Sequence, residues 1–261
     1  MLFGIMQGRL SKSKTGVLQY LPKKWKIEFI RLKKTKLDYI ELFTTKIYDN
    51  SPIWNKNELI LKKKILQTKL KKIILCDNYA FKKSLISNNY KNYFNKITDK
   101  LSLFQNSTLI IPISSVFFEK KNYPKLKNVL RYFLIVSKKK NIEISFEVEV
   151  PFKKILKLKK DLKNDLFKIT FDIGNIFLIH KTNKSIINYL KRTKNLINHI
   201  HIKDRDNFGN NVVLGDGLIN FKIIFRYLKK IKYNRTLTFE TNRGKHFFST
   251  AKNNLAFIKK F

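Results

Sequence analysis

Polar side chains that can bind metal ions or move protons follow four apolar segments in the second half of the chain. These strand-like segments end at Glu147, Asp172, His201 and Glu240. Three carboxylates and one imidazole, without a thiolate, suit Mn²⁺, Mg²⁺, Co²⁺ or Zn²⁺. A single carboxylate at a strand end is better explained as a helix N-cap or a surface ion pair than as a metal ligand. Four such residues on consecutive strands indicate a site for one divalent metal ion.

Two of these segments offer a choice of side chain. Because side chains alternate along a strand, His199 and His201 point to the same side. We expect His201, nearer the end of the strand, to be the ligand, and His199 to support the site through a hydrogen bond. Glu147 closes its apolar run, whereas Glu149 lies beyond it, close to Pro151. This placement favours Glu147 as the ligand.

Short apolar segments of this kind recur at fairly even spacing along the whole chain. Most are apolar throughout, which is typical of a parallel sheet that is covered on both faces. The expected strands are Leu2–Met6, Leu37–Leu42, Lys72–Cys76, Thr108–Ile113, Ile142–Glu147, Phe167–Asp172, Asn198–Ile202 and Thr236–Glu240.

Lysine-rich segments with helical periodicity separate these strands. Phe221, Ile224, Phe225 and Leu228, for example, are spaced as one face of a helix. Strands and helices that alternate eight times over about 250 residues predict an α/β fold, a (β/α)8 TIM barrel, with a doubly wound open sheet as the alternative. Active sites of such barrels lie at the C-terminal ends of the strands, where the polar residues fall. No linker divides the chain, so we expect a single domain over residues 1–261.

The composition is that of a globular protein with a strongly basic surface. The formal net charge is +38, and lysines are spread over the whole chain while only eight arginines occur. Since arginine is the better reader of bases and phosphates, this distribution favours a solvated lysine-rich surface, typical of an AT-rich genome, over a nucleic-acid footprint. A positive field would still favour anionic, phosphorylated substrates.

The remaining features predict where the protein works. A single cysteine, Cys76, excludes an intramolecular disulfide framework and a cysteine-rich zinc site. The apolar opening Met1–Met6 is too short for a signal peptide, and no long uncharged run follows that would span a membrane. We expect a cytoplasmic enzyme.

Several motifs, in this order and spacing, resemble the xylose isomerase-like TIM barrel superfamily and, within it, the sugar phosphate isomerase/epimerase family. The resemblance covers nearly the whole chain. Its motifs are Gly4–Ser11, Ile40–Leu42, Cys76–Tyr79, Glu147 ahead of Pro151, Asp172–Asn175, His199–Arg205, Leu214–Gly217 and Phe239–Glu240.

The resemblance implies a divalent-metal-dependent isomerase or epimerase of a small sugar or sugar phosphate. The metal ion would be bound by the residues that match Glu147, Asp172, His201 and Glu240. In related ketose epimerases the two glutamates also form the acid/base pair that moves a proton beside a carbonyl, through a metal-stabilised cis-enediolate. Glu147 and Glu240 are therefore the expected catalytic residues.

The same resemblance indicates residues that contact the substrate. Arg205 matches a substrate-contacting arginine of the epimerases, and Asn175 stands where several relatives have a histidine. An amide can bind a sugar hydroxyl but takes no proton at physiological pH. Further expected contacts at strand ends are Lys203, Gln7, Arg9, Glu41 and Asp77.

Other functions are compatible with the same barrel. A metal-dependent dehydratase or other lyase acting on a carbonyl sugar would use the same site. An endonuclease IV-like enzyme is disfavoured, because its zinc centre uses several histidines and this chain has only four histidines in all. A non-catalytic sugar-binding barrel would bind no metal. We expect a small-molecule partner, neither nucleic acid nor membrane, and a homodimer or homotetramer.

Overall fold

The computed structural model describes residues 1–13, 18–82 and 84–261. Eight parallel strands form a closed barrel in the order β1-β10-β7-β6-β5-β4-β3-β2, and helices surround it. The predicted (β/α)8 fold is therefore confirmed. The barrel strands are β1 (Leu2–Met6), β2 (Tyr39–Thr44), β3 (Ile74–Asp77), β4 (Thr108–Ile113), β5 (Glu143–Val148), β6 (Ile169–Asp172), β7 (Ile197–Ile202) and β10 (Thr236–Phe239).

Strand bounds match the sequence prediction closely, although β2, β3 and β6 each begin two residues later than expected. The strand expected at Leu37–Leu42 begins at Tyr39 and ends at Thr44. Lys36 has a positive φ of 64°, and the Asp38 carboxylate accepts a hydrogen bond from the Phe3 N–H, 2.8 Å away. The residues before Tyr39 therefore form a turn instead of the first part of the strand.

Helices follow most strands, and none in the described ranges is long and apolar enough to cross a membrane. The α-helices are α1 (Lys26–Lys33), α2 (Glu58–Leu66), α3 (Tyr79–Lys82), α4 (Asn88–Ser102), α5 (Tyr123–Lys139), α6 (Phe152–Leu162), α7 (Ile173–His180), α8 (Asn183–Thr193), α9 (Phe221–Lys230) and α10 (Phe247–Lys259). Two 3-10 helices, η1 (Pro52–Trp54) and η2 (Ser115–Phe118), and a small antiparallel pair, β8 (Asp204–Arg205) with β9 (Asn211–Val212), complete the elements.

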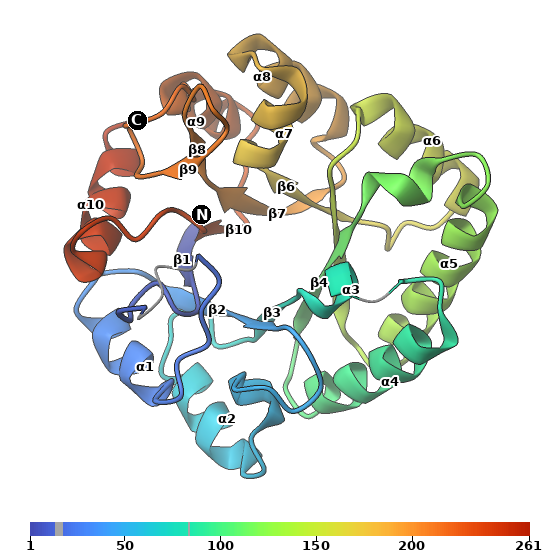
Figure 1. Cartoon of the computed structure of the whole chain (residues 1–261), viewed down its shortest axis with the longest axis horizontal. Coiled ribbons are helices and arrows are strands. Elements are labelled where there is room, and N and C mark those ends of the chain that lie inside the picture. The colour runs from blue at the N-terminus through green and yellow to red at the C-terminus, as the bar shows by residue number, and fades with distance from the viewer. Residues whose placement is uncertain (14–17, 83) are drawn as a thin grey trace. The chain divides into compact units, whose positions relative to one another are not determined.

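Contacts within the chain group into two compact units. Unit 1 comprises Met1–Glu41, Thr68–Leu70 and Phe171–Phe261, and unit 2 comprises Leu42–Gln67 and Lys71–Thr170. In unit 1, α8, α9 and α10 lie on the outer side of β7 and β10 (Figure 1). The predicted apolar face of α9 is buried at all four positions, Phe221, Ile224, Phe225 and Leu228. Phe225 also stacks on Phe3 of β1, with ring centroids 6.4 Å apart.

Unit 2 has the same local construction. Its α4 and α5 lie outside β3 and β4 (Figure 1). Every residue of β4 is buried, as expected for a strand covered on both faces. Phe94 of α4 and Phe133 of α5 stack with centroids 4.1 Å apart, which joins the two helices through an aromatic pair.

Candidate metal centre and its surroundings

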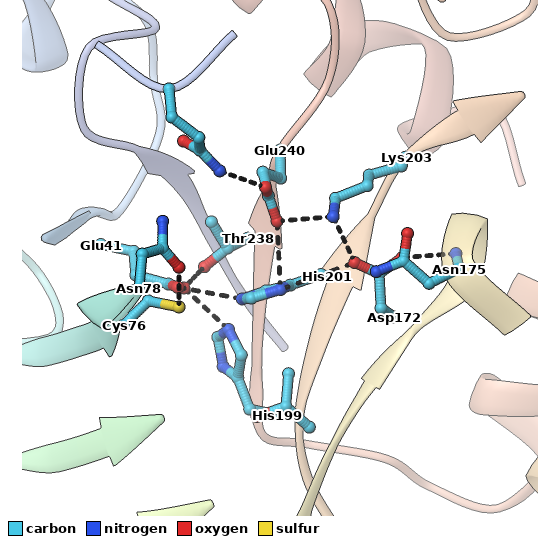
Figure 2. A network of polar contacts seen from close by, with 12 residues as sticks. Glu41, Cys76, Asn78, Asp172, Asn175, His199, His201, Lys203, Thr238 and Glu240 are labelled. Carbon is cyan, nitrogen blue, oxygen red and sulfur yellow. Dashed lines mark hydrogen bonds and ion pairs between the residues drawn. The ribbon is translucent and has the colours of Figure 1, made fainter. Parts of the chain in front are cut away.

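Two carboxylates and one imidazole converge at the strand ends of unit 1. They are Asp172 at the end of β6, His201 on β7 and Glu240 directly after β10. The His201 Nδ1 lies 3.2 Å from Glu240 Oε2 and 3.7 Å from Asp172 Oδ2 (Figure 2). All three side chains are buried. The three residues were predicted to meet, and their ligand atoms lie within 4.8 Å of one another, close enough to hold a metal ion.

A lysine bridges the two carboxylates of this cluster. The Lys203 Nζ lies 2.7 Å from Asp172 Oδ2 and 3.0 Å from Glu240 Oε2 (Figure 2). Burial raises the pKa of Asp172, but the nearby charges of Lys203 and His201 outweigh it and hold that pKa below its ordinary range. Lys203, expected from sequence to contact substrate, thus lies among the predicted metal ligands.

The second oxygen of Asp172 has a local structural task. Asp172 is the N-cap of α7, and its Oδ1 accepts a hydrogen bond from the Asn175 N–H at 2.9 Å. The Asp172 carboxylate is therefore a helix N-cap and is also placed to act as a metal ligand. One oxygen caps a helix, and the other faces the cluster.

A buried glutamate on β2 fixes the orientation of His201. Glu41 Oε1 lies 2.9 Å from His201 Nε2, and Glu41 Oε2 lies 2.9 Å from His199 Nε2. Thr238 Oγ1 donates to Glu41 Oε2 at 2.5 Å. With Nε2–H donated to Glu41, Nδ1 of His201 is the nitrogen that can bind a metal ion. Burial raises the pKa of Glu41, but His201 and His199 outweigh it, so the pKa is lowered.

Glu147, the fourth predicted ligand, belongs to unit 2. It lies near the end of β5 and is buried, whereas Glu149 is exposed. Its register partner on β6 is Thr170, two residues before Asp172. The choice of Glu147 over Glu149 as a metal ligand stays a prediction.

The two residues expected to bind substrate hydroxyls contact each other. Arg205 Nη2 donates to Asn175 Oδ1 at 2.7 Å, and Nη1 donates to the Gly209 carbonyl at 3.2 Å. Gly174 lies against them, since a Cβ there would come within 3.1 Å of Arg205 Nε and 2.7 Å of Lys203 Cβ. The glycine after β6 thus allows this close packing.

Asp204 organises the loop that follows β7. Its buried carboxylate accepts hydrogen bonds from the N–H groups of Arg205, Gly215, Gly217 and Ile219, at 2.9 to 3.2 Å. Two N–H groups of the motif Leu214–Gly217 thus bind this aspartate, which gives the motif a structural role. A Cβ at Gly217 would lie 2.2 Å from Asp204 Oδ1.

Three other expected contacts have structural partners. Arg9 is buried, and its Nε donates to the Thr241 carbonyl at 2.8 Å, while burial lowers its pKa to about 10. Asp77, in unit 2, accepts hydrogen bonds from the hydroxyls of Tyr90 and Tyr93, and burial raises its pKa to about 7. Gln7 is buried, and its backbone N–H donates to the Glu41 carbonyl at 2.8 Å. Contact of Arg9, Asp77, Gln7 or Glu41 with a substrate stays a prediction.

Gln19 and Glu28 also contact residues of this region, although no sequence pattern predicted a role for either. Gln19 Nε2 donates to Glu240 Oε1 at 2.6 Å. Glu28 on α1 accepts hydrogen bonds from the N–H groups of Gly8 and Leu10. Gln19 belongs to no motif and to no regular element, and Glu28 occupies an ordinary helical position, so no pattern pointed to either residue.

Comparison with solved structures finds the same fold over essentially the whole chain. An L-ribulose 3-epimerase matches with a TM-score of 0.78 and 15% identity, covering 100% of this chain and 94% of the other. The IOLI protein with a bound zinc atom matches with a TM-score of 0.70 and 15% identity, covering 100% and 96%. The probable 3-DHS dehydratase AsbF from Bacillus anthracis matches with a TM-score of 0.72 and 12% identity, covering 99% of each chain.

Comparison with curated protein sequences gives no match. The family model described as xylose isomerase-like TIM barrel matches residues 108–261, more than half of the chain. That stretch contains β4 to β10 and every one of the four predicted metal ligands. The chain belongs to the xylose isomerase-like TIM barrel family.

Proposed function

We propose that this chain is a divalent-metal-dependent isomerase or epimerase of a small sugar or sugar phosphate. The observation that carries the proposal is the buried cluster of Asp172, His201 and Glu240, with the imidazole held by Glu41 so that Nδ1 faces the two carboxylates. Carboxylate and imidazole donors fit Mn²⁺, Mg²⁺, Co²⁺ or Zn²⁺. When bound, such an ion polarises a carbonyl and its neighbouring hydroxyl and stabilises the charge that develops there.

Glu147 is the fourth ligand in this proposal. It is a buried carboxylate near the C-terminal end of β5. Active-site residues of such barrels come from the C-terminal ends of several strands, which supports Glu147 as a ligand.

Glu147 and Glu240 are the proposed acid/base pair. One carboxylate takes a proton from the carbon beside the substrate carbonyl, and the other returns a proton to the opposite face or to the neighbouring carbon. Lys203, Arg205 and Asn175 are the proposed contacts for substrate oxygens. Their donors at the strand ends suit hydroxyl or phosphate groups.

The comparisons support this reaction class. The structural relatives include an L-ribulose 3-epimerase and a zinc-binding protein, both over the whole chain. AsbF, a probable dehydratase on the same fold, keeps dehydration as a second candidate. Dehydration also begins when a proton is taken from the carbon beside the carbonyl, and a hydroxyl group, protonated as it leaves, then departs as water from the next carbon. The same two carboxylates would serve as base and acid.

Metal content and proton exchange test the proposal. Purified protein supplied with Mn²⁺ or Co²⁺ is expected to hold one ion per chain, and to lose it in His201→Ala. Incubation with ketoses and their phosphates in D2O should then introduce deuterium beside the carbonyl, and Glu240→Gln should abolish the exchange. A product lacking the elements of water would indicate the dehydratase instead. A wild-type protein that binds no divalent ion would refute the metal-dependent reaction.

We also propose that residues 1–261 act as a single domain in the cytoplasm and assemble as a homodimer or homotetramer. Sedimentation of the purified protein measures the assembly directly. Cleavage of abasic-site DNA, measured in parallel, checks the disfavoured endonuclease function.

A further inference from the structure

Gln19, in the segment between β1 and α1, is bonded to one of the two proposed acid/base residues. Its Nε2 donates to Glu240 Oε1 at 2.6 Å. A carboxylate only accepts hydrogen bonds, so the amide must present its NH₂ group to Glu240. The Gln19 carbonyl oxygen therefore points away from Glu240.

This contact divides the two oxygens of Glu240 between different partners. Oε1 is held by Gln19, while Oε2 lies 3.2 Å from His201 Nδ1 and 3.0 Å from Lys203 Nζ. Tilting the carboxylate out of this plane would break the Gln19 hydrogen bond. Gln19 thus fixes the orientation in which the Glu240 carboxylate faces the predicted metal ligand His201.

Buried Arg9 holds the residue before Gln19 in place. Arg9 Nη1 donates to the Leu18 carbonyl, and Arg9 Nε donates to the carbonyl of Thr241 at 2.8 Å. Thr241 directly follows Glu240 in the chain. One guanidinium therefore joins the segment that carries Gln19 to the segment that carries Glu240.

The residue after Gln19 is also held. The Tyr20 carbonyl packs so closely on Gly8 that a Cβ at Gly8 would lie 2.0 Å from it, and Gly8 has a φ of +85° that suits glycine. Arg243 lies over the Tyr20 ring, 5.9 Å from its centroid, and donates from Nε to the Gly8 carbonyl at 2.9 Å. With both neighbours anchored, the Gln19 side chain is presented to Glu240 from a fixed backbone.

The Gln19 carbonyl oxygen is buried and accepts no hydrogen bond within the described part of the chain. A buried amide oxygen without a donor is unfavourable, so a group that donates to it gains affinity. A sugar hydroxyl is such a donor, and the amide is already bonded to a residue that would touch the substrate.

We propose that Gln19 orients Glu240 through its NH₂ group and accepts a hydrogen bond from a substrate hydroxyl through its carbonyl. This inference rests on the proposed function, because it takes Glu240 as metal ligand and acid/base residue. It adds a residue from the loop after β1 to the site. It also gives buried Arg9 a positioning role, since Arg9 anchors the backbone beside Gln19 and Glu240.

Mn²⁺ titration by calorimetry tests the positioning role without any substrate. Gln19→Leu is expected to weaken Mn²⁺ binding about 10- to 100-fold, the usual loss when a hydrogen bond to a metal ligand is removed. Gln19→Asn, which keeps the amide but shortens it by one methylene, should show a loss in the same direction. Gln105→Leu makes the same change at an exposed glutamine and should bind Mn²⁺ as wild type does. Wild-type affinity in both Gln19 variants would overturn the positioning role.

The carbonyl contact is tested with the ketose that wild type turns over fastest and its monodeoxy analogues. Gln19→Leu should raise KM for the parent sugar by about tenfold, the value of one hydrogen bond of about 1.4 kcal/mol. For the analogue that lacks the contacted hydroxyl, the penalty should disappear. An equal penalty on every analogue would overturn the carbonyl contact. If wild type moves no proton on any sugar, the proposed reaction fails, and the Mn²⁺ titration still decides the role of Gln19 at Glu240.

Discussion

Lys203 is the cation that balances the two carboxylates of the candidate centre, and its removal is expected to lower the folding stability of the protein. Its Nζ lies 2.7 Å from Asp172 and 3.0 Å from Glu240, and all three side chains are buried. In Lys203→Met both carboxylates would remain buried without their partner. Removing one partner of a buried ion pair typically costs about 3–5 kcal/mol of folding stability.

Urea denaturation in EDTA measures this loss. Lys69→Met is the matched control, because Lys69 also lies 2.7 Å from a carboxylate, that of Asp38, but is 72% exposed. An exposed ion pair is worth about 0–1 kcal/mol, so the control should lose no more than that. A Lys203→Met protein as stable as the Lys69→Met control would refute the reasoning.

Added Mn²⁺ gives the second half of the same test. A divalent ion bound by Asp172 and Glu240 would replace the charge of the missing ammonium group. An ion present at a hundredfold excess over its Kd adds about 2.7 kcal/mol of stability. Mn²⁺ is therefore expected to restore most of the stability lost in Lys203→Met, and to bind this variant more tightly than wild type, since no lysine competes for the carboxylates. Equal or weaker Mn²⁺ binding by the variant would show that Lys203 does not compete.

Three further substitutions test other contacts. Glu41→Gln is expected to weaken Mn²⁺ binding about 10- to 100-fold in calorimetry, because the amide has no charge and only one acceptor oxygen for the two imidazoles that Glu41 holds; unchanged affinity would contradict the orienting role of Glu41. Burial raises the pKa of Glu28 from 4.5 to about 7, so wild type should lose about 3 kcal/mol of stability relative to Glu28→Gln between pH 4 and pH 8, as the buried carboxyl gives up its proton. Urea melts of both proteins across this range measure the difference, and parallel pH profiles would contradict the shift. Gly217→Ala should destabilise the loop after β7 by about 1–3 kcal/mol, because the new Cβ would lie 2.2 Å from Asp204 Oδ1; a melting temperature equal to that of wild type would argue against this close contact.

The sequence predicted the barrel because each strand carries its own pattern. β1 and β4 have the expected bounds, since short apolar runs between lysine-rich helices specify both. The meeting of Asp172, His201 and Glu240 could also be predicted, because parallel strands bring their carboxyl ends to one edge. Both features follow from the local pattern of apolar residues and from the common direction of the strands in a barrel.

Contacts between distant segments could not be predicted in this way. The Glu41 carboxylate accepts hydrogen bonds from His199 and His201, more than 150 residues along the chain, and no local pattern relates these residues. Arg9 donates to the backbone carbonyls of Leu18 and Thr241, which its charge alone does not specify. Gln19 lies in an irregular segment, where no periodicity relates a side chain to a face. Only the folded backbone decides these partners.

The carboxylate of Asp204 divides the loop after β7 into a base that it holds by hydrogen bonds and a tip that it does not contact. Its hydrogen bonds to Arg205, Gly215 and Gly217 close the loop at its base, next to the candidate centre. The residues between are not held by Asp204, and at Phe208 the side chain is 83% exposed. Substitutions at an exposed tip residue such as Phe208 would leave the base of the loop in place. Selection could therefore alter which molecules the tip meets while the acids and the imidazole stay where they are.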